Sequence, residues 1–144
     1  MGYGLGAAIG AQIANPDRVV IDIAGDGCFR MNNIEIATAV EYNIPVIIAI
    51  MNNHALGMVR QWQTLFYDRR FSHTTLAGSM DFVKLAEAHG AIGMKVTKPE
   101  DVDGALIEAI AAKRPVVINF EVGRDEKVFP MVAPGKGIDE IVLE

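Results

Sequence analysis

The sequence is poor in the residues that build disulfide frameworks and metal clusters. Its 144 residues include one cysteine and three histidines. This excludes an internal disulfide framework and a cysteine-rich zinc site, and it leaves little room for a histidine cluster. Basic residues are also in the minority, because 13 Lys and Arg against 18 Asp and Glu give a formal net charge of −5. Such a balance argues against nucleic-acid binding as the main function, since domains with that function are usually basic.

Long hydrophobic runs are absent as well. No apolar stretch approaches the roughly 18 residues that a membrane span needs, and no basic region followed by an apolar one marks a secretory signal. Apolar residues nevertheless make up 51% of the chain, which is enough for a real core at this length. We therefore expect an acidic, cytoplasmic protein with a single domain over 1–144 that binds neither membranes nor nucleic acid.

Short β-branched runs alternate with longer helical patterns along the chain. Strands are expected at 18–24, 46–51, 93–97 and 115–122, and the first two read as buried on both faces. Helices are expected at 3–14, 34–42, 58–67, 81–89 and 100–113. Asn32 or Asn33 would cap the second helix, and Gly90 would end the fourth. The alternation predicts an α/β fold with a doubly wound, mostly parallel sheet and helices on both of its faces.

Polar residues follow the two strongest strands, at the edge where such sheets bind ligands. Gly25-Asp26-Gly27-Cys28 comes after the first strand, and Asn52-Asn53 comes after the second. The glycines allow close approach to a ligand, and a helix expected to begin near Asn33 favours an anion there. A carboxylate beside an anion is explained by a bridging cation, and the oxygens of Asp26 and Asn53 suit Mg²⁺. An isolated Gly-Asp-Gly is most often a plain turn, but the two segments together favour the cation site.

These segments resemble the fingerprint of thiamine-diphosphate enzymes, in which GDG and NN are separated by a spacer like the 24 residues of 28–51. The stretch 1–12 resembles the segment just upstream of this fingerprint in thiamine-diphosphate enzymes that use 2-oxo acids. Three others resemble the large subunit of acetohydroxyacid synthase (acetolactate synthase), namely 56–63, 66–67 and 128–132. The resemblance covers essentially the whole chain. It implies the diphosphate-binding domain of the thiamine-diphosphate fold, which is usually the C-terminal part of a larger three-domain subunit.

The resemblance also implies roles for individual residues. Asp26 and Asn53 match the side-chain ligands of Mg²⁺, and Ala55 matches a ligand that gives its backbone carbonyl. The other positions that match the cofactor site are Met1, Gly25, Gly27, Cys28, Leu56, Gly57 and Met58. The wall of the substrate pocket is matched by Met58, Val59 and Trp62.

The implied reaction is the condensation of pyruvate with a second 2-oxo acid, pyruvate again or 2-oxobutanoate, in branched-chain amino-acid biosynthesis. In this family the activating glutamate lies on a pyrimidine-binding domain, which usually precedes this one and meets it across a subunit interface. A middle domain binds FAD. We therefore expect no catalytic residue within this chain, FAD only in a longer protein, a homo-oligomer, and room for a regulatory small subunit. The chain alone is expected to be inactive and to self-associate.

Two alternatives remain open at this stage. One is a different thiamine-diphosphate enzyme acting on 2-oxo acids, such as a pyruvate oxidase, a glyoxylate carboligase or a decarboxylase. The segments 56–63 and 128–132 favour the synthase. The other alternative is a natural, non-catalytic split subunit that pairs with a separate pyrimidine-binding chain. No partner pattern supports Cys28 as a nucleophile, and His54, His73 and His89 read as surface or packing residues.

Overall fold

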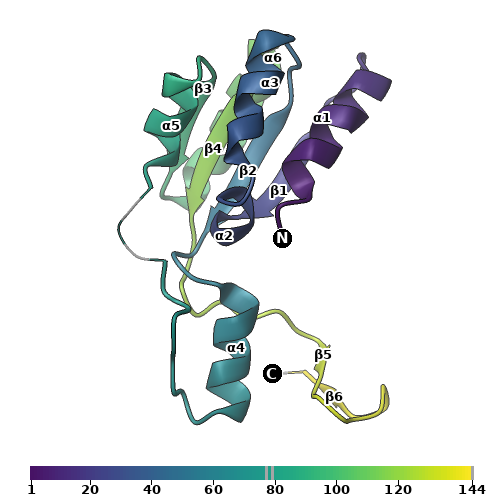
Figure 1. Cartoon of the computed structure of the whole chain (residues 1–144), viewed down its shortest axis with the longest axis vertical. Coiled ribbons are helices and arrows are strands. Elements are labelled where there is room, and N and C mark those ends of the chain that lie inside the picture. Colours follow the sequence, from purple (N-terminus) through teal and green to yellow (C-terminus); the bar gives the residue numbers. More distant parts are fainter. Residues whose placement is uncertain (77, 79, 144) are drawn as a thin grey trace.

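Four parallel strands form the centre of the protein (Figure 1). The structure is a computed structural model and describes all residues except 77, 79 and 144. Its central strands are β1 (Ile21–Gly25), β2 (Ile47–Asn52), β3 (Ile92–Val96) and β4 (Val116–Glu121). They pair in the order β1-β2-β4-β3, and every pair is parallel. Their carboxyl ends therefore meet at one edge of the sheet, the lower edge in Figure 1.

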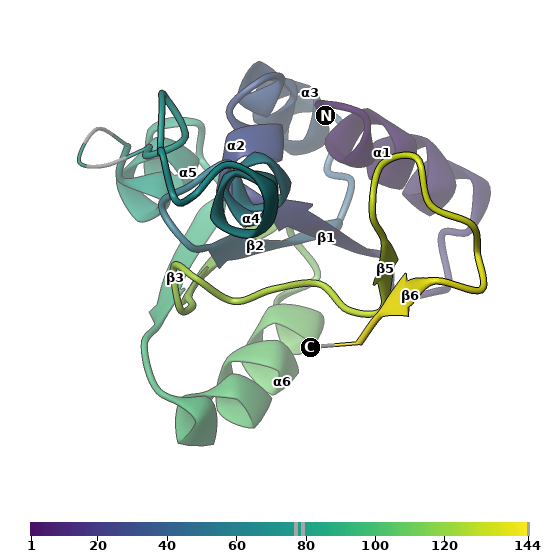
Figure 2. The same ribbon diagram turned by 90° about the horizontal axis from the view of Figure 1, so that it is seen from below.

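Helices cover both faces of this sheet (Figure 2). One face carries α1 (Gly4–Ala14), α3 (Ile36–Glu41) and α5 (Phe82–Ala88), and the opposite face carries α6 (Val102–Ala112). Shorter helical turns are α2 (Asp26–Phe29), η1 (Asn33–Glu35) and η2 (Pro99–Asp101). The predicted α/β class, with a parallel sheet between two helical layers, is confirmed.

The core lies on both sides of the two central strands. On β2, Ile48 and Ile50 join one buried cluster together with Phe29 and Phe82 under the three-helix layer. The neighbouring positions Ile47 and Ala49 point the other way, into a second cluster with Val116 and Ile118 of β4. Full burial of one such aliphatic side chain contributes roughly 1.5–3 kcal/mol. The prediction that 46–51 is buried on both faces is therefore confirmed.

The same prediction was wrong for β1. Asp22 and Ala24 are buried, but Ile21 is 39% exposed and Ile23 is 75% exposed. The reason is that β1 is an edge strand, and α6 packs on β3 and β4 at the far side of that face. A continuous apolar run does not reveal which of its residues lacks a covering helix.

Two helix ends also differ from expectation. The segment 34–42 divides into η1 and α3, and neither asparagine before it caps a helix with its side chain. Asn32 Nδ2 instead donates to the carbonyl of Gly2 at 2.7 Å, and Asn33 Nδ2 donates to the carbonyl of Arg30 at 3.0 Å. Gly90 does follow the end of α5 and has a φ of +84°, a left-handed conformation that glycine adopts without strain.

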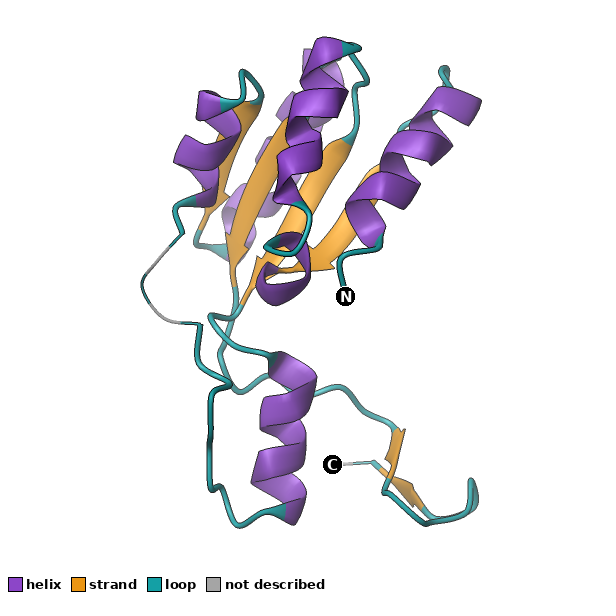
Figure 3. Cartoon of the chain, in the orientation of Figure 1, coloured by secondary structure: helices purple, strands orange, loops and turns teal. Residues whose placement is uncertain are grey.

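Helix α4 (Gly57–Phe66) and the C-terminal tail extend beyond the carboxyl edge of the sheet (Figure 3). Gln61 ties the two together, because its Nε2 donates to the Val128 carbonyl at 3.0 Å and its Oε1 accepts from the Val128 amide at 2.8 Å. The tail ends in a small antiparallel pair, β5 (Met131–Val132) and β6 (Ile141–Val142), which was not predicted. None of the helices in the described part of the chain is both long and apolar enough to cross a membrane.

Candidate cofactor-binding site

Asp26 lies at the carboxyl end of β1 and is the first residue of α2. A helix thus begins here, seven residues before the expected start near Asn33. The Asp26 side chain is buried, with 1% of the residue exposed. Its Oδ2 has no hydrogen-bond partner among the described residues. Because a buried carboxylate oxygen without a partner is costly, this atom is suited to receive a cation.

Burial also raises the pKa of Asp26 above its ordinary value. A hydrogen bond from the Gly27 amide and the nearby charges of Arg30 and His54 act in the opposite direction, but they do not outweigh burial. A divalent cation beside Oδ2 would favour the charged form much more strongly. The positive charge already near Asp26 is thus too weak to offset its burial, and a bound metal ion would add to it.

The turn after β2 carries two successive asparagine side chains that bond to the backbone two residues further on. Asn52 Oδ1 accepts from the His54 amide at 3.2 Å, and Asn53 Oδ1 accepts from the Ala55 amide at 3.0 Å. These bonds give a compact turn of the kind that asparagine favours. Ala55 is 3% exposed and forms an antiparallel bridge with Thr75. This pairing with the segment near Thr75 was not predicted.

A cavity of about 370 Å³ brings the predicted cofactor-binding residues together. Every one of them lines it: Met1, Gly25, Asp26, Gly27, Cys28, Asn53, Ala55, Leu56, Gly57 and Met58. Sequence reasoning missed Met51, Val122 and Glu126, which also line this cavity. Val122 directly follows β4, but the predicted strand 115–122 included it, so a search after the predicted strand end would start one residue too late.

Two glycines leave room that any side chain would fill. A Cβ at Gly27 would stand 2.7 Å from Leu56 Cδ2 and 3.2 Å from Leu76 Cδ1. A Cβ at Gly57 would stand 2.9 Å from Asn53 Nδ2. A side chain at either position would therefore force Leu56 or Asn53 to move at the cavity wall.

The donor set fits a magnesium ion held jointly with a phosphate-bearing ligand. Asp26, Asn53 and Ala55 line the same cavity, and together they would offer a carboxylate, an amide oxygen and a backbone carbonyl. Within the described residues, no group of three or more His, Cys, Asp or Glu is placed to hold a metal by itself. Mg²⁺ commonly binds through one or two carboxylates together with substrate phosphates and water. The site thus suits a metal diphosphate better than a free metal ion.

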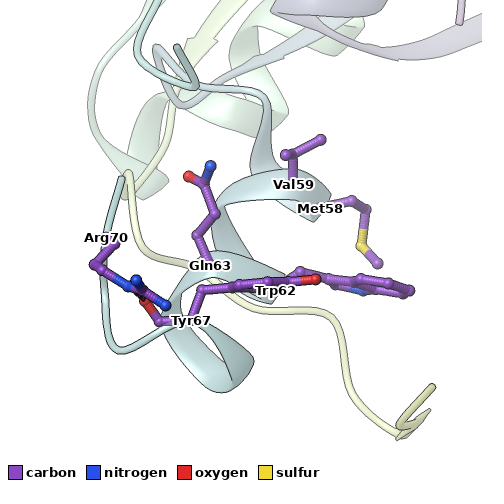
Figure 4. Close-up of a pocket in the computed structure, with 6 residues that line it drawn as sticks. All are labelled: Met58, Val59, Trp62, Gln63, Tyr67 and Arg70. Carbon is purple, nitrogen blue, oxygen red and sulfur yellow. Dashed lines mark hydrogen bonds between the residues drawn. The ribbon is translucent and has the colours of Figure 1, made fainter. Parts of the chain in front are cut away.

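A second cavity, of about 630 Å³, lies along α4 (Figure 4). Met58 and Val59 line both cavities, and Trp62 lines only this one. Trp62 is 39% exposed and makes an edge-to-face contact with Phe66, with ring centroids 6.0 Å apart. The structure thus brings the three predicted pocket residues to one wall.

Three further residues of this second cavity were missed by sequence reasoning: Gln63, Tyr67 and Arg70. In the view of Figure 4, Tyr67 lies between Arg70 and Trp62, and the Gln63 side chain lies above them. A signal for two of them was present, because Val59, Gln63 and Tyr67 are spaced four apart and so share one side of a helix.

Comparison with known proteins identifies the family of this domain. Residues 1–120 match the family model described as "Thiamine pyrophosphate enzyme, C-terminal TPP binding domain". The chain belongs to this family. The predicted thiamine-diphosphate resemblance is therefore confirmed.

Relatives of this thiamine-diphosphate-binding domain include several acetolactate synthases. The chain is 51% identical to "Acetolactate synthase catalytic subunit, mitochondrial" from Saccharomyces cerevisiae over 142 residues, covering 99% of the chain and 20% of that protein. It is 50% identical to acetolactate synthase from Mycobacterium avium over 146 residues, covering 98% of the chain and 24% of the relative. The chain thus spans a fifth to a quarter of the length of these relatives.

A solved structure shares the fold. The Rhodococcus jostii RHA1 thiamine diphosphate-dependent 4-hydroxybenzoylformate decarboxylase superposes with a TM-score of 0.82 at 38% identity. The match covers 88% of this chain and 24% of that chain. The same domain fold therefore occurs in a thiamine-diphosphate enzyme named for a different reaction.

Proposed function

We propose that this chain binds Mg²⁺ together with the diphosphate of thiamine diphosphate. Asp26 and Asn53 provide side-chain ligands to the metal, and Ala55 provides its backbone carbonyl. The observation that carries the proposal is the buried Asp26 Oδ2, which lacks a partner among the described residues in a cavity shared with Asn53 and Ala55. Membership of a thiamine-diphosphate-binding family supports the diphosphate as the co-ligand.

The other cavity residues divide into two groups in this proposal. Gly25, Gly27 and Cys28 form the loop that holds the diphosphate end, with the Cys28 backbone amide as a donor. Leu56, Gly57 and Met58 lie along the rest of the cofactor, and Met1 packs against its pyrimidine ring. These residues bind and orient the cofactor, and their apolar side chains exclude water from it.

In the longer protein we propose an acetolactate synthase activity, with pyruvate and a second 2-oxo acid such as 2-oxobutanoate as substrates. Bound thiamine diphosphate supplies the electron sink for decarboxylating one 2-oxo acid and the carbon nucleophile that attacks the other. Met58, Val59 and Trp62 form the wall against which the substrates are placed. The acetolactate synthase relatives and the α4 segment support this choice. The matched decarboxylase structure supports the alternative function, which is that of a different thiamine-diphosphate enzyme acting on a 2-oxo acid.

The proposed activity needs parts that these 144 residues do not contain. A pyrimidine-binding domain of a partner subunit provides the activating glutamate, and a separate domain binds FAD. A homo-oligomer and a regulatory small subunit complete the assembly. We propose a cytoplasmic location, although the yeast relative's name places that protein in the mitochondrion. The chain alone binds the diphosphate end of the cofactor weakly and has no carboligase activity.

Calorimetric titration with thiamine diphosphate, with Mg²⁺ or with excess chelator, tests the binding proposal. We expect saturable binding that requires Mg²⁺. Binding of equal strength in chelator would contradict the metal assignment, and no binding at millimolar cofactor would contradict the site itself. An acetolactate assay on the same sample should show no product, and turnover would refute the requirement for further domains.

A further inference from the structure

The turn that carries Asn53 and Ala55 contains a residue in an unfavourable backbone conformation. His54, between these two proposed metal ligands, has a φ of +56°. This left-handed region is disfavoured for residues other than glycine, and residues held in it depend on surrounding contacts. The contacts of His54 therefore decide how firmly the ligands on either side of it are placed.

The His54 side chain is held by Glu121. His54 Nε2 lies 2.7 Å from Glu121 Oε2. Glu121 is the last residue of β4 and is paired in register with Asn52, the last residue of β2. The next amide, that of Val122, donates to the Asn52 carbonyl at 3.1 Å. The carboxylate thus projects from a backbone that is fixed to the strand preceding the turn.

Two further donors fix the other oxygen of this carboxylate. Lys95 Nζ of β3 lies 3.1 Å from Glu121 Oε1. Asn119 Nδ2 of β4 donates to the same oxygen at 3.1 Å. With Oε1 held by two donors from the sheet, Oε2 is left pointing at His54. The carboxylate therefore connects β3 and β4 to the turn.

On its other side, among the described residues, the turn is held through backbone hydrogen bonds. The Leu56 amide donates to the Thr74 carbonyl at 2.8 Å, and the Leu76 amide donates to the His54 carbonyl at 2.8 Å. These bonds attach the turn to the segment after α4. They do not attach it to the sheet, which carries Asp26 at the end of β1. Two side-chain links do: the His54–Glu121 contact, and the bond from the His54 amide to Oδ1 of Asn52 at the end of β2.

We infer that Glu121 is a positioning residue for the metal-binding turn and acts through His54. It keeps the 53–55 backbone in the conformation that presents Asn53 Oδ1 and the Ala55 carbonyl to the cavity shared with Asp26. Glu121 itself does not line this cavity and is not a ligand. The inference rests on the proposed binding of Mg²⁺ and diphosphate. Groups that orient metal ligands in this way typically change metal affinity 10–100-fold when they are removed.

A double-mutant cycle on the 144-residue chain tests this. The variants are Glu121→Ala, Glu121→Gln, His54→Ala and the double variant Glu121→Ala/His54→Ala. Glu140→Gln, which alters an exposed ion pair with Lys136, is the matched control. Binding of Mg²⁺ with thiamine diphosphate is measured by calorimetry, and the free energy of unfolding is measured by urea. Amide hydrogen exchange is followed at Ala55, Leu56 and Leu76.

We expect about 10-fold weaker binding in Glu121→Ala and in His54→Ala, and no further loss in the double variant. A smaller loss is expected in Glu121→Gln, and none in the control. Exchange at the three amides should accelerate about 10-fold in both single alanine variants, also without cofactor. Should Glu121→Ala fail to fold, His54→Ala removes the same contact at a partly exposed position and allows the same measurements of affinity and exchange.

The inference is overturned by additive losses in the double variant, since they would show that the two residues act independently. It is also overturned by a lower free energy of unfolding without any change in affinity, which is the signature of a purely structural role. If the wild-type chain binds no cofactor, the proposed function fails. Unchanged amide exchange in the single alanine variants would then still refute the positioning role, and accelerated exchange would support it.

Discussion

Gly4 packs directly against the carboxylate of Asp22, so that a β-carbon at position 4 would overlap Asp22 Oδ1. The first turn of α1 therefore rests on the edge strand β1 through a contact that only glycine allows. Asp22 is buried, and its Oδ2 has no partner within the described part of the chain. The close contact predicts a steric effect of a substitution at Gly4, and the burial of Asp22 predicts an electrostatic effect of neutralising its carboxylate.

The steric prediction concerns Gly4→Ala. We expect it to lower the free energy of unfolding by about 1–3 kcal/mol, because the added methyl group must displace either α1 or the Asp22 side chain. Gly10→Ala in the same helix is the matched control, since a Cβ there meets nothing within 4 Å. That control should gain roughly 0.5–1 kcal/mol from the better helix propensity of alanine. Equal effects of both substitutions in urea unfolding would contradict the close contact.

The electrostatic prediction concerns Asp22→Asn. Burial raises the pKa of Asp22 above the value of 3.8 that it has when exposed. Between 3.8 and the raised value the folded chain binds more protons than the unfolded chain, so the stability contributed by this group falls as the pH rises through that window. We expect Asp22→Asn to be more stable than wild type at neutral pH. The gain should disappear below pH about 4, and a gain of the same size at pH 3 would contradict the assignment.

A third prediction separates binding from stability at Asp26. Asp26→Ala should abolish Mg²⁺-dependent binding of thiamine diphosphate, because it removes the only charged ligand of the proposed site. Asp26→Asn should raise the free energy of unfolding in chelator by about 1 kcal/mol or more, because it removes a buried charge without a partner. Glu126→Gln is the control, since Glu126 lines the same cavity but is not a proposed ligand. Unchanged cofactor affinity in Asp26→Ala would rule out this ligand.

A fourth prediction concerns the exposed apolar residues around the two cavities. Met1 is 71% exposed, Met58 50% and Trp62 39%. Clustered apolar surface of this kind marks an interaction site. We expect concentration-dependent self-association of the chain in sedimentation experiments and a weaker effect in the double variant Met58→Lys/Trp62→Lys. A purely monomeric profile at high concentration would contradict this.

The neighbourhood of Asp26, Asn53 and Ala55 could be predicted from the sequence because parallel strands bring their carboxyl ends to one edge. Register alone then places residues 25–28 and 52–56 side by side, whatever the details of packing. The exposure of Ile23 could not be predicted in this way, because it depends on where α6 lies across the sheet. The bridge between Ala55 and Thr75 could not be predicted either, since residues 74–76 show no periodic pattern of apolar residues. The His54–Glu121 link joins side chains far apart in sequence and has no local signal.

Helix α4 contributes Met58 and Val59 to both cavities, yet Trp62 and Gln63 reach only the larger one. Its distal half projects away from the sheet and is tied to the C-terminal tail through Gln61. Substitutions in that half can reshape the larger cavity and leave the turn at 53–55 on the sheet edge unchanged. The fold can therefore acquire new specificities, because substitutions in one helix and in the tail bound to it can alter the larger cavity by themselves. The smaller cavity, which Asp26 and Asn53 line at the sheet edge, can meanwhile keep its shape.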